Sequence, residues 1–335
     1  MSKPKVAING FGRIGRAAFK AILDKNNAEI VAINDLTDTK TLANLLKYDS
    51  VYGRYDKDVS YDDSHLVVDG VSYRVLSEKD PANLPWQELG VDVVLECTGV
   101  FRTKEKASAH LQAGARAVII SAPAKDEETQ TVVLGVNAGG EDKVESGVLS
   151  NASCTTNCIA PVAQVIQSHF GVQKALMTTI HAYTADQRLV DAPHRDLRRG
   201  RAAAQNIVPT TTGAAIATGK VVPELAGIFD GLAIRVPVVC GSLADFTFLL
   251  KRKTTVEEVN QVLQEAAQSD RFKGILEVTD EPLVSSDIVG RSASSIVDLS
   301  LTKVIDGDLV KVVAWYDNEW GYANRLVEMV NNIAF

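Results

Sequence analysis

The chain has 335 residues, of which 46% are hydrophobic and 23% charged, so it carries enough apolar material for sizeable cores and is not a disordered chain. Lys and Arg number 35 against 42 Asp and Glu, and the resulting net charge of −7 gives no general reason to bind nucleic acid or an anionic membrane. This length corresponds to about two domains at roughly 150 residues each.

Apolar strand patterns alternate with helical patterns over the first half of the chain. Strands are expected at 6–9, 29–34, 91–96 and 117–121, and helices at 13–23 and 104–113. Buried strands that alternate with helices predict a parallel, doubly wound Rossmann sheet. Residues 59–76 predict a hairpin excursion from that sheet, with its turn at Asp69-Gly70.

Longer strand patterns replace this alternation after about Ser150. They cover 175–182, 232–239, 245–250, 294–301 and 309–315, with helices expected at 155–169 and 255–268. The change predicts a second, α+β domain with a mixed or antiparallel sheet. Residues 320–335 predict an amphipathic helix that returns to the first domain. We therefore expect a first domain over 1–152, completed by a helix at about 318–335, and a second domain over 153–317.

The cysteines and the N-terminus indicate a reducing compartment. Four cysteines are too few for a disulfide framework, and together with five histidines they match no zinc spacing, so no metal is expected. The N-terminal residues have no signal-peptide h-region, so no signal segment is expected, and the apolar runs are shorter than the ~20 residues that span a bilayer. We expect a cytoplasmic protein without nucleic-acid or membrane partners.

A glycine-rich turn follows the first strand and opens the first helix. The segment Gly10-Phe11-Gly12-Arg13-Ile14-Gly15 fits G-x-G-x-x-G. The first glycine permits a tight turn, the second lets the backbone approach a pyrophosphate, and the third allows close helix–strand packing. Asp35, 20 residues after Gly15, is placed to bind a ribose 2′-hydroxyl and to repel a 2′-phosphate. The motif predicts an NAD site, with a purely structural turn as the alternative.

A candidate nucleophile stands at the start of the helix expected from Thr155. Cys154 lies between Ser153 and Thr155. A thiolate at a helix N-terminus is stabilised by unpaired N–H groups and by the helix dipole, and the same groups stabilise a substrate oxyanion. The alternative, a buried structural cysteine, is the interpretation we keep for Cys158.

Three further features suggest a base and anion-binding groups to accompany this nucleophile. His181 ends an apolar strand and is a candidate base for Cys154, although a lone histidine in this setting is more often a core residue. Arg235 lies mid-strand among apolar residues and must be paired or bind an anion. The stretch Thr210–Gly213 is either a phosphate-binding loop or a helix cap. The basic run 195–201 is read as a solvated or inter-subunit loop.

Taken together, the chain resembles the bacterial type of phosphorylating glyceraldehyde-3-phosphate dehydrogenase over essentially its whole length. The resemblance rests on INGFGRIGR at 8–16, INDLTD at 33–38, KYDSVYG at 47–53, SAPAK at 121–125, SNASCTTNC at 150–158, HAYTADQ at 181–187, PHRDLRRGRAAA at 193–204, PTTTGAA at 209–215, IRVPV at 234–238 and WYDNEWGY at 315–322.

The resemblance implies a role for each matching residue. Cys154 would be the nucleophile and His181 its base. In the cofactor site, Arg13 and Ile14 would hold the pyrophosphate, Asp35 the adenosine ribose, and Asn318 the nicotinamide carboxamide, with Tyr322 near that ring and Lys79 and Ser121 along the adenine and nicotinamide-ribose side. Thr184 and Arg235 would bind the substrate phosphate. The attacking inorganic phosphate would be bound by Ser153, Thr155, Thr212 and Gly213, with Arg199 near the phosphates.

The resemblance also implies a homotetramer that oxidises glyceraldehyde 3-phosphate with NAD and inorganic phosphate through a Cys154 thioester. The nearest enzyme alternative is erythrose-4-phosphate dehydrogenase, whose product is an acid and which consumes no phosphate. A non-catalytic binding or surface role is the alternative from another class.

Three positions depart from the family pattern. Ala192 stands before Pro193 where NAD-using members have Leu, so we expect NAD preference with weaker use of NADP. Cys240 follows RVPVV where the family segment differs, and it is interpreted as a packing substitution open to oxidation. Gly200 replaces a usual Ala and is expected to make the basic loop more mobile.

Overall fold

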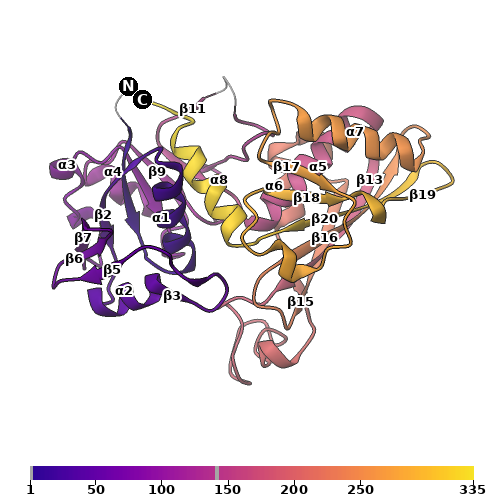
Figure 1. The fold of residues 1–335 in the computed structure, drawn as a ribbon. Helices are drawn as coiled ribbons and strands as arrows, with labels where there is room; N and C mark the ends of the chain where they lie inside the picture. The colour runs from indigo at the N-terminus through magenta and orange to yellow at the C-terminus, as the bar shows by residue number, and fades with distance from the viewer. Residues whose placement is uncertain (1–2, 140–142) are drawn as a thin grey trace. The chain divides into compact units, whose positions relative to one another are not determined.

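The computed structural model describes residues 3–139 and 143–335 (Figure 1). The chain divides into two compact units. The first unit holds the described residues of Met1–Val132, Glu141–Ala152 and Ala323–Phe335, and the second holds those of Val133–Gly140 and Ser153–Tyr322. Each unit combines helices with one main sheet, so each is described by itself.

The sheet of the first unit is parallel over most of its width. In order across the sheet its strands are β10 (Gln130–Thr131), β12 (Val148–Ser150), β9 (Ala117–Ile120), β8 (Val93–Glu96), β1 (Lys5–Asn9), β2 (Glu29–Asn34), β7 (Val71–Leu76), β6 (His65–Val68) and β5 (Val59–Tyr61). Neighbours from β10 through β7 are parallel, and β7, β6 and β5 pair antiparallel. The predicted Rossmann sheet is confirmed.

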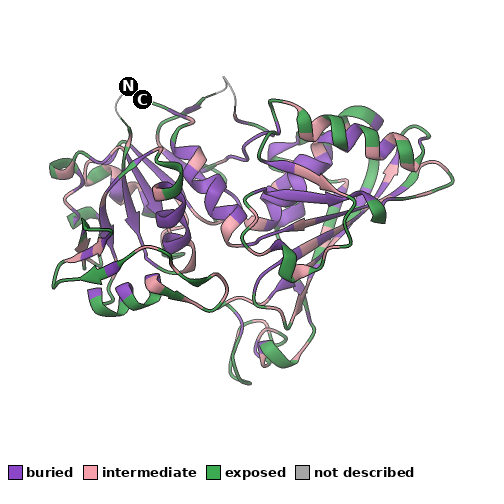
Figure 2. Cartoon of the chain, viewed as in Figure 1, coloured by how far each residue is buried: buried purple, intermediate pink, exposed green. Residues whose placement is uncertain are grey.

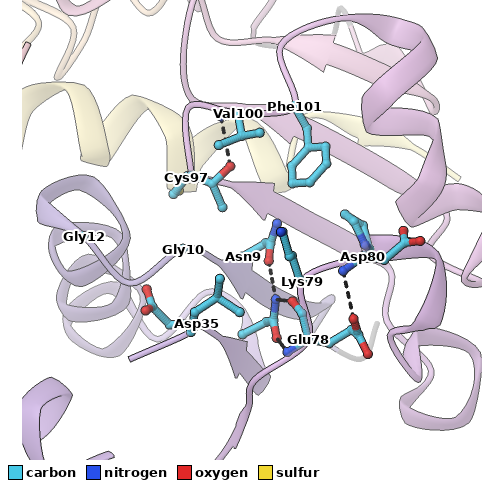
Figure 3. Close-up of a pocket in the computed structure, with 14 residues that line it drawn as sticks. Asn9, Gly10, Gly12, Asp35, Glu78, Lys79, Asp80, Cys97, Val100 and Phe101 are labelled. Carbon is cyan, nitrogen blue, oxygen red and sulfur yellow. Dashed lines mark hydrogen bonds between the residues drawn. The ribbon is translucent and has the colours of Figure 1, made fainter. Parts of the chain in front are cut away.

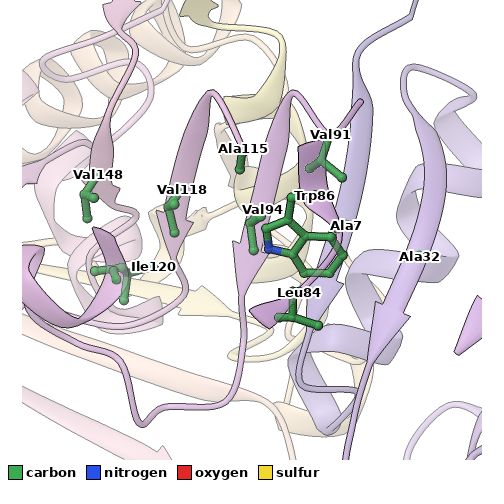
Figure 4. Close-up of a cluster of buried hydrophobic side chains, with 11 residues drawn as sticks. Ala7, Ala32, Leu84, Trp86, Val91, Val94, Ala115, Val118, Ile120 and Val148 are labelled. Atoms are coloured by element: carbon green, nitrogen blue, oxygen red, sulfur yellow. The ribbon is translucent and has the colours of Figure 1, made fainter. Parts of the chain in front are cut away.

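Helices and a buried hydrophobic core complete the first unit. The helices are α1 (Arg13–Lys25), α2 (Thr39–Lys47), α3 (Trp86–Leu89), α4 (Lys104–Gln112) and, from Ala323 onward, α8 (Trp320–Val330). The short strands are β3 (Tyr48–Asp49) and β4 (Gly53–Arg54), which pair with each other, and β11 (Val144–Glu145) and β21 (Ile333–Ala334), which also pair. The fully buried Trp86 lies among Ala7, Leu84 and Val94 (Figure 4). Truncating such a side chain to alanine costs about 3–5 kcal/mol.

The second unit has the predicted mixed sheet. Its strands run in the order β14 (Val208–Thr211), β15 (Phe229–Val236), β13 (Val172–Ala182), β16 (Ser242–Leu250), β20 (Leu309–Tyr316), β18 (Ser295–Asp298) and β17 (Leu276–Thr279), and β19 (Lys303–Ile305) pairs with β20. The pairs β13–β15 and β17–β18 are parallel and the others antiparallel. The helices are α5 (Cys154–Phe170), α6 (Ala214–Val221) and α7 (Val256–Gln268).

Burial alternates along the strands of this second sheet. In β16, Ser242, Ala244, Phe246, Phe248 and Leu250 are buried, whereas the residues between them are only partly covered (Figure 2). Successive side chains point to opposite faces of a strand, and α5 packs against β13, β16, β18 and β20. One face of the sheet is therefore the core of the unit, and the other face carries half-exposed side chains.

Several element boundaries differ from the sequence prediction. The helix expected to reach residue 335 ends at Val330, and Ile333–Ala334 forms β21 beside β11. The strand expected to run to 301 ends at Asp298, whose carboxylate accepts from Ser300 N (3.2 Å) and caps a 3₁₀ turn over Leu299–Leu301. The other 3₁₀ turns are Pro81–Asn83, Ala203–Gln205, Pro223–Leu225 and Ser285–Ile288.

The hairpin prediction was right about the turn and wrong about its place. Asp69 and Gly70 have φ of 49° and 79°, the left-handed values that a two-residue hairpin turn requires. However, β7 continues alongside β2 in parallel, so the hairpin extends the main sheet instead of standing outside it. A hydrophobic pattern read on its own carries no information about this long-range partner.

The glycine-rich turn is fixed by close backbone approaches. A Cβ on Gly15 would lie 2.1 Å from the carbonyl oxygen of Gly10, and one on Gly10 (φ +93°) would lie 2.7 Å from Thr98 N. Nothing lies within 4 Å of the Cβ position of Gly12. The first and third glycines are therefore required by packing, whereas the second leaves open space beside the backbone.

Alanine substitutions at Gly15 and at Gly12 should differ in their effect on stability. We expect Gly15→Ala to destabilise the protein by about 1–3 kcal/mol, because α1 must move away from β1 to admit the methyl group. Gly12→Ala should cost less than about 1 kcal/mol, since only the helix N-cap is affected. Thermal midpoints of the two purified variants check this, and equal midpoints would contradict the packing role of Gly15.

Candidate active site

Cys154 is the first residue of α5. The Ser153 side chain caps this helix by accepting from Thr156 N (3.0 Å), which is the local reason that the helix begins where it does. The preceding Ala152 has φ 54°, a left-handed conformation that is costly for a residue with a side chain. The backbone thus turns sharply to place the Cys154 thiol at the N-terminal end of a long helix.

His181 and Arg235 face each other across the parallel pair β13–β15. Nε2 of His181 lies 3.5 Å from Sγ of Cys154. Nδ1 lies 2.6 Å from the carbonyl oxygen of Ala182, to which only an N–H can donate. This contact assigns the proton of the neutral ring to Nδ1, so Nε2 is left as the acceptor that faces the thiol.

Arg235 packs against the same histidine. Its Nη1 donates to the Ala182 carbonyl oxygen (3.1 Å) and to Thr184 Oγ1 (3.3 Å), and lies 3.1 Å from His181 Nδ1. Burial raises the pKa of the Cys154 thiol, and the positive charge of Arg235 opposes this rise. Burial and Arg235 together hold the pKa of His181 well below its usual range. His181 is therefore neutral at pH 7 and available as a base.

Tyr316 is a site residue that sequence reasoning missed. Its hydroxyl lies 2.9 Å from both Thr155 Oγ1 and Thr179 Oγ1, and its ring meets that of His181 edge-on at 5.9 Å. Tyr316 thereby holds the Thr155 side chain in place and packs against the ring of His181. The alternation of side chains along 309–316 was the available signal, but it does not say which residue lies across from Tyr316.

The threonine-rich stretch is divided between a strand and a helix start. Thr210 and Thr211 belong to β14, which corrects their assignment to a loop, and Gly213 is the N-cap of α6. Arg199 donates to Thr210 Oγ1 (2.9 Å) and to the Thr211 carbonyl oxygen (3.0 Å), and it pairs with Asp186. Thr212 Oγ1 accepts from Ala214 N (3.2 Å). Arg199 therefore anchors the strand that leads into Thr212–Gly213.

The first unit carries a pocket of about 780 Å³ at the carboxyl ends of β1, β2 and β8 (Figure 3). Predicted cofactor residues Gly10, Gly12, Asp35 and Lys79 line it. Asp35 is braced by two backbone donors, Phe11 N (2.7 Å) and Thr37 N (2.9 Å). This is the place in an open α/β sheet where ligands bind.

The other predicted cofactor residues lie elsewhere. Arg13 and Ile14 open α1, and the Arg13 guanidinium pairs with Asp49 (2.6 Å), so it is not aimed at the pocket as a free cation. Ser121 follows β9 and donates its N–H to the Glu96 carbonyl oxygen (2.9 Å). Asn318 and Tyr322 belong to the second unit, where both are buried.

A buried polar network that the sequence did not reveal forms the floor of the pocket. Asn34 donates to Asn9 Oδ1 (2.7 Å) and exchanges two bonds of 2.9 Å with the backbone of Glu78. The carboxylate of Glu96, which is 1% exposed, accepts from Thr98 N (2.9 Å) and from Asn9. Two walls of the pocket, at Glu78 and Thr98, are thus tied to the ends of the central strands.

The departures from the family pattern have structural roles. A Cβ on Gly200 would lie 2.8 Å from the Ala192 carbonyl oxygen, so Gly200 allows two passes of the loop to approach closely. Cys240 is 1% exposed, with its thiol 3.2 Å from Asp317 Oδ1. Cys158 is fully buried beside Ser295, as expected of a packed residue. The four cysteines are free thiols.

Comparisons with known proteins decide the family. A model of the NAD binding domain of glyceraldehyde 3-phosphate dehydrogenase matches residues 4–104, and one of its C-terminal domain matches residues 153–318. The chain belongs to the glyceraldehyde-3-phosphate dehydrogenase family. It is therefore a member of a family of NAD-dependent oxidoreductases, with NAD as cofactor.

Relatives named glyceraldehyde-3-phosphate dehydrogenase align along nearly the whole chain. The protein of Streptomyces coelicolor is 55% identical over 97% of both chains, and that of Geobacillus stearothermophilus is 54% identical over 98% of both. The Thermotoga maritima protein is 57% identical, again over 97% of both chains.

Neither a metal cluster nor a membrane-spanning helix is found in the part of the chain that the structure describes. Within residues 3–139 and 143–335, no cluster of three or more His, Cys, Asp or Glu side chains is arranged to hold a metal ion. In the same residues, none of the helices has the length and apolar character needed to cross a bilayer.

The position of Arg235 makes a prediction about Cys154. Replacing Arg235 by Gln removes a positive charge that favours the thiolate, so the pKa of Cys154 should rise. Because the thiolate is the form that is alkylated, the pH profile of iodoacetamide inactivation should move to higher pH, and the rate at pH 7 should fall about tenfold. The control is Arg291→Gln, which removes a charge paired with Glu277 (2.6 Å). An unmoved profile in Arg235→Gln would rule out this electrostatic role.

Proposed function

We propose that this protein catalyses the reversible oxidative phosphorylation of D-glyceraldehyde 3-phosphate to 1,3-bisphosphoglycerate with NAD. The observation that carries the proposal is the thiol of Cys154 at the start of α5, 3.5 Å from the acceptor nitrogen of His181. Arg235, beside that histidine, supplies the cation that a phosphorylated substrate needs. Membership of the family selects this chemistry among those open to a Cys–His pair.

The first unit and its pocket are assigned to NAD. Asp35, already oriented by two backbone N–H groups, would bind the adenosine ribose, and Lys79 would lie along the adenine side. The open space at Gly12 and the first-turn N–H groups of α1, at Arg13 and Ile14, suit a pyrophosphate. The remaining cofactor roles fall to Ser121, Asn318 and Tyr322. NAD, when bound, supplies the acceptor for the hydride that leaves the aldehyde carbon.

Cys154 and His181 carry out the oxidation. Sγ of Cys154 gives its proton to Nε2 of His181 and bonds to the aldehyde carbon, and His181 passes that proton to the resulting alkoxide oxygen, which gives a hemithioacetal and a neutral base. His181 then removes the hydroxyl proton as the hydride departs, and a thioester on Cys154 remains. A thioester keeps the acyl group activated, whereas an oxygen ester would lose that energy. The N–H groups at the N-terminus of α5 stabilise the negatively charged substrate oxygen in the forward and in the reverse reaction.

Two phosphate sites complete the reaction. Thr184 and Arg235, which are hydrogen-bonded to each other, would bind the substrate phosphate. Inorganic phosphate would be bound by Ser153, Thr155, Thr212 and Gly213, with Arg199 anchoring the strand before them. Its oxygen attacks the thioester carbon and forms the acyl phosphate, and the Cys154 sulfur leaves and regains its proton.

The same reasoning assigns the domains and the assembly. Residues 1–152, together with the helix at about 318–335, would form the cofactor domain, and residues 153–317 the substrate domain. We infer a homotetramer. On the second sheet, Leu176 and Leu232 are 65% and 45% exposed, and the loop that follows β13 exposes Leu189 and Leu197 by 83% and 85%. Exposed apolar side chains in such number favour burial against further copies of the chain.

The deciding assay is NAD reduction with glyceraldehyde 3-phosphate, with and without inorganic phosphate. We expect multiple turnovers only with phosphate, because the thioester must be resolved by phosphate. Cys154→Ser should abolish turnover while leaving NAD binding nearly unchanged, since it replaces one sulfur atom by oxygen and alters none of the residues assigned to the cofactor. Turnover indifferent to phosphate would favour a dehydrogenase that releases an acid, such as erythrose-4-phosphate dehydrogenase. Absence of NAD binding would favour a non-catalytic role.

Cofactor selectivity follows from the Asp35 carboxylate. We expect kcat/KM to be higher with NAD than with NADP, because Asp35 repels a 2′-phosphate, with some NADP use permitted by the small Ala192. Asp35→Asn should reduce the difference in kcat/KM between NAD and NADP, because it removes the negative charge and keeps an acceptor oxygen. Steady-state kinetics with both cofactors measure this, and equal efficiencies in the unmodified protein would refute the preference.

A further inference from the structure

Ser242, the first residue of β16, joins two parts of the candidate site. It is 1% exposed. Its Oγ lies 2.8 Å from Oδ1 of Asn318 and 3.1 Å from the backbone nitrogen of Ala182, the residue after His181. The neighbouring Gly241 N also reaches Asn318 Oδ1, at 3.2 Å. One short turn therefore contacts both Asn318 and the strand that carries the candidate base.

The direction of each of these hydrogen bonds is determined. A backbone N–H only donates, so the Asn318 atom that faces Gly241 N is the carbonyl oxygen. Ala182 N likewise donates to Ser242 Oγ, which leaves the hydroxyl hydrogen free to point at Asn318 Oδ1. Within the described residues, Nδ2 of Asn318 makes no hydrogen bond. Asn318 therefore offers a donor, and not an acceptor, to a bound molecule.

The turn before Ser242 has little freedom to move. Gly241 has φ +88°, and a Cβ there would lie 2.2 Å from the carbonyl oxygen of Ser285. On its other side, the Cys240 thiol lies 3.2 Å from Asp317 Oδ1. Asp317 Oδ1 in turn accepts from Glu319 N and Trp320 N, 2.9 and 2.8 Å away, at the start of α8. The backbone on both sides of Asn318 and Ser242 is thus held in place.

We propose that Ser242 is a positioning residue that fixes the Asn318 amide with Nδ2 outward, so that it donates to the carboxamide oxygen of the nicotinamide ring. This inference rests on the proposed function, in which Asn318 holds that carboxamide. Ala182 extends the connection, because its N–H donates to Ser242 and its carbonyl oxygen accepts from His181 and Arg235. The cofactor contact and the base are aligned through the backbone of this one residue.

A cofactor analogue distinguishes this role from a merely structural one. The nicotinamide carboxamide has both a donor and an acceptor, so it can pair with a loosened Asn318 in either orientation. The acetyl group of 3-acetylpyridine adenine dinucleotide has only an acceptor, so it requires Nδ2. Loosening Asn318 should therefore weaken binding of the analogue more than binding of NAD.

The experiment is calorimetric titration of cofactor-stripped full-length protein with NAD and with the acetylpyridine analogue. For Ser242→Ala we expect the Kd of NAD to rise about threefold or less and that of the analogue about tenfold, the scale of one hydrogen bond. The matched control is Ser295→Ala, which removes another fully buried strand hydroxyl that contacts Cys158 (3.7 Å) and not Asn318. It should leave the ratio of the two Kd values unchanged.

The outcomes separate the proposal from the function on which it rests. Normal NAD binding with the same Kd ratio in Ser242→Ala as in the unmodified protein would overturn the role of Ser242 alone. Failure of the unmodified protein to bind NAD would overturn both proposals. If the thermal midpoint shows that Ser242→Ala is unfolded, Asn318→Asp takes its place. It offers an oxygen where Nδ2 stood, so the analogue should bind at least tenfold more weakly relative to NAD, and an unchanged ratio would overturn the proposal.

Discussion

The parallel register between β13 and β15 is the constraint on which the candidate active site depends. It places His181 directly opposite Arg235. Side chains alternate between the two faces of a strand, so a slip of one residue would send one of the two to the other side of the sheet. The contacts of Arg235 with His181, Ala182 and Thr184 would then be lost together. The hydrophobic alternation of the buried face is what holds this register.

In the proposed mechanism, Arg235 would contribute to phosphate binding and to the reactivity of Cys154 with the same charge. A cation that binds a phosphate is also, at this distance, one that favours the thiolate of Cys154 and disfavours protonation of His181. The two effects act in the same direction, because a nucleophile that is easier to ionise and a base that stays neutral both promote attack. Burial works against the thiolate, so the helix N-terminus and Arg235 are needed to offset it.

Sequence reasoning succeeded where the local backbone decides the outcome. The Gly10–Gly15 turn and the placement of Cys154 at the start of a helix follow from neighbouring residues alone, and both are found as predicted. The parallel sheet and the mixed sheet were likewise predictable from strand and helix patterns. The place of the hairpin at β6 and β7, and the strand β21 after α8, depend on partners far along the chain, and there the prediction failed.

The sequence did not reveal the residues that act by positioning other side chains. The place of Tyr316 in the site depends on its hydrogen bonds with Thr155 and Thr179, which lie on other elements. The place of Ser242 depends in the same way on Asn318 and Ala182. Neither carries a chemical signature of its own, since a tyrosine or a serine in a strand is ordinary.

What distinguishes these residues is the direction of their hydrogen bonds. Ser242 accepts from one backbone group and donates to one amide, so it transmits orientation as well as position. A network of that kind determines which atom of the Asn318 amide faces a bound molecule. The identity of the residue alone does not predict that orientation.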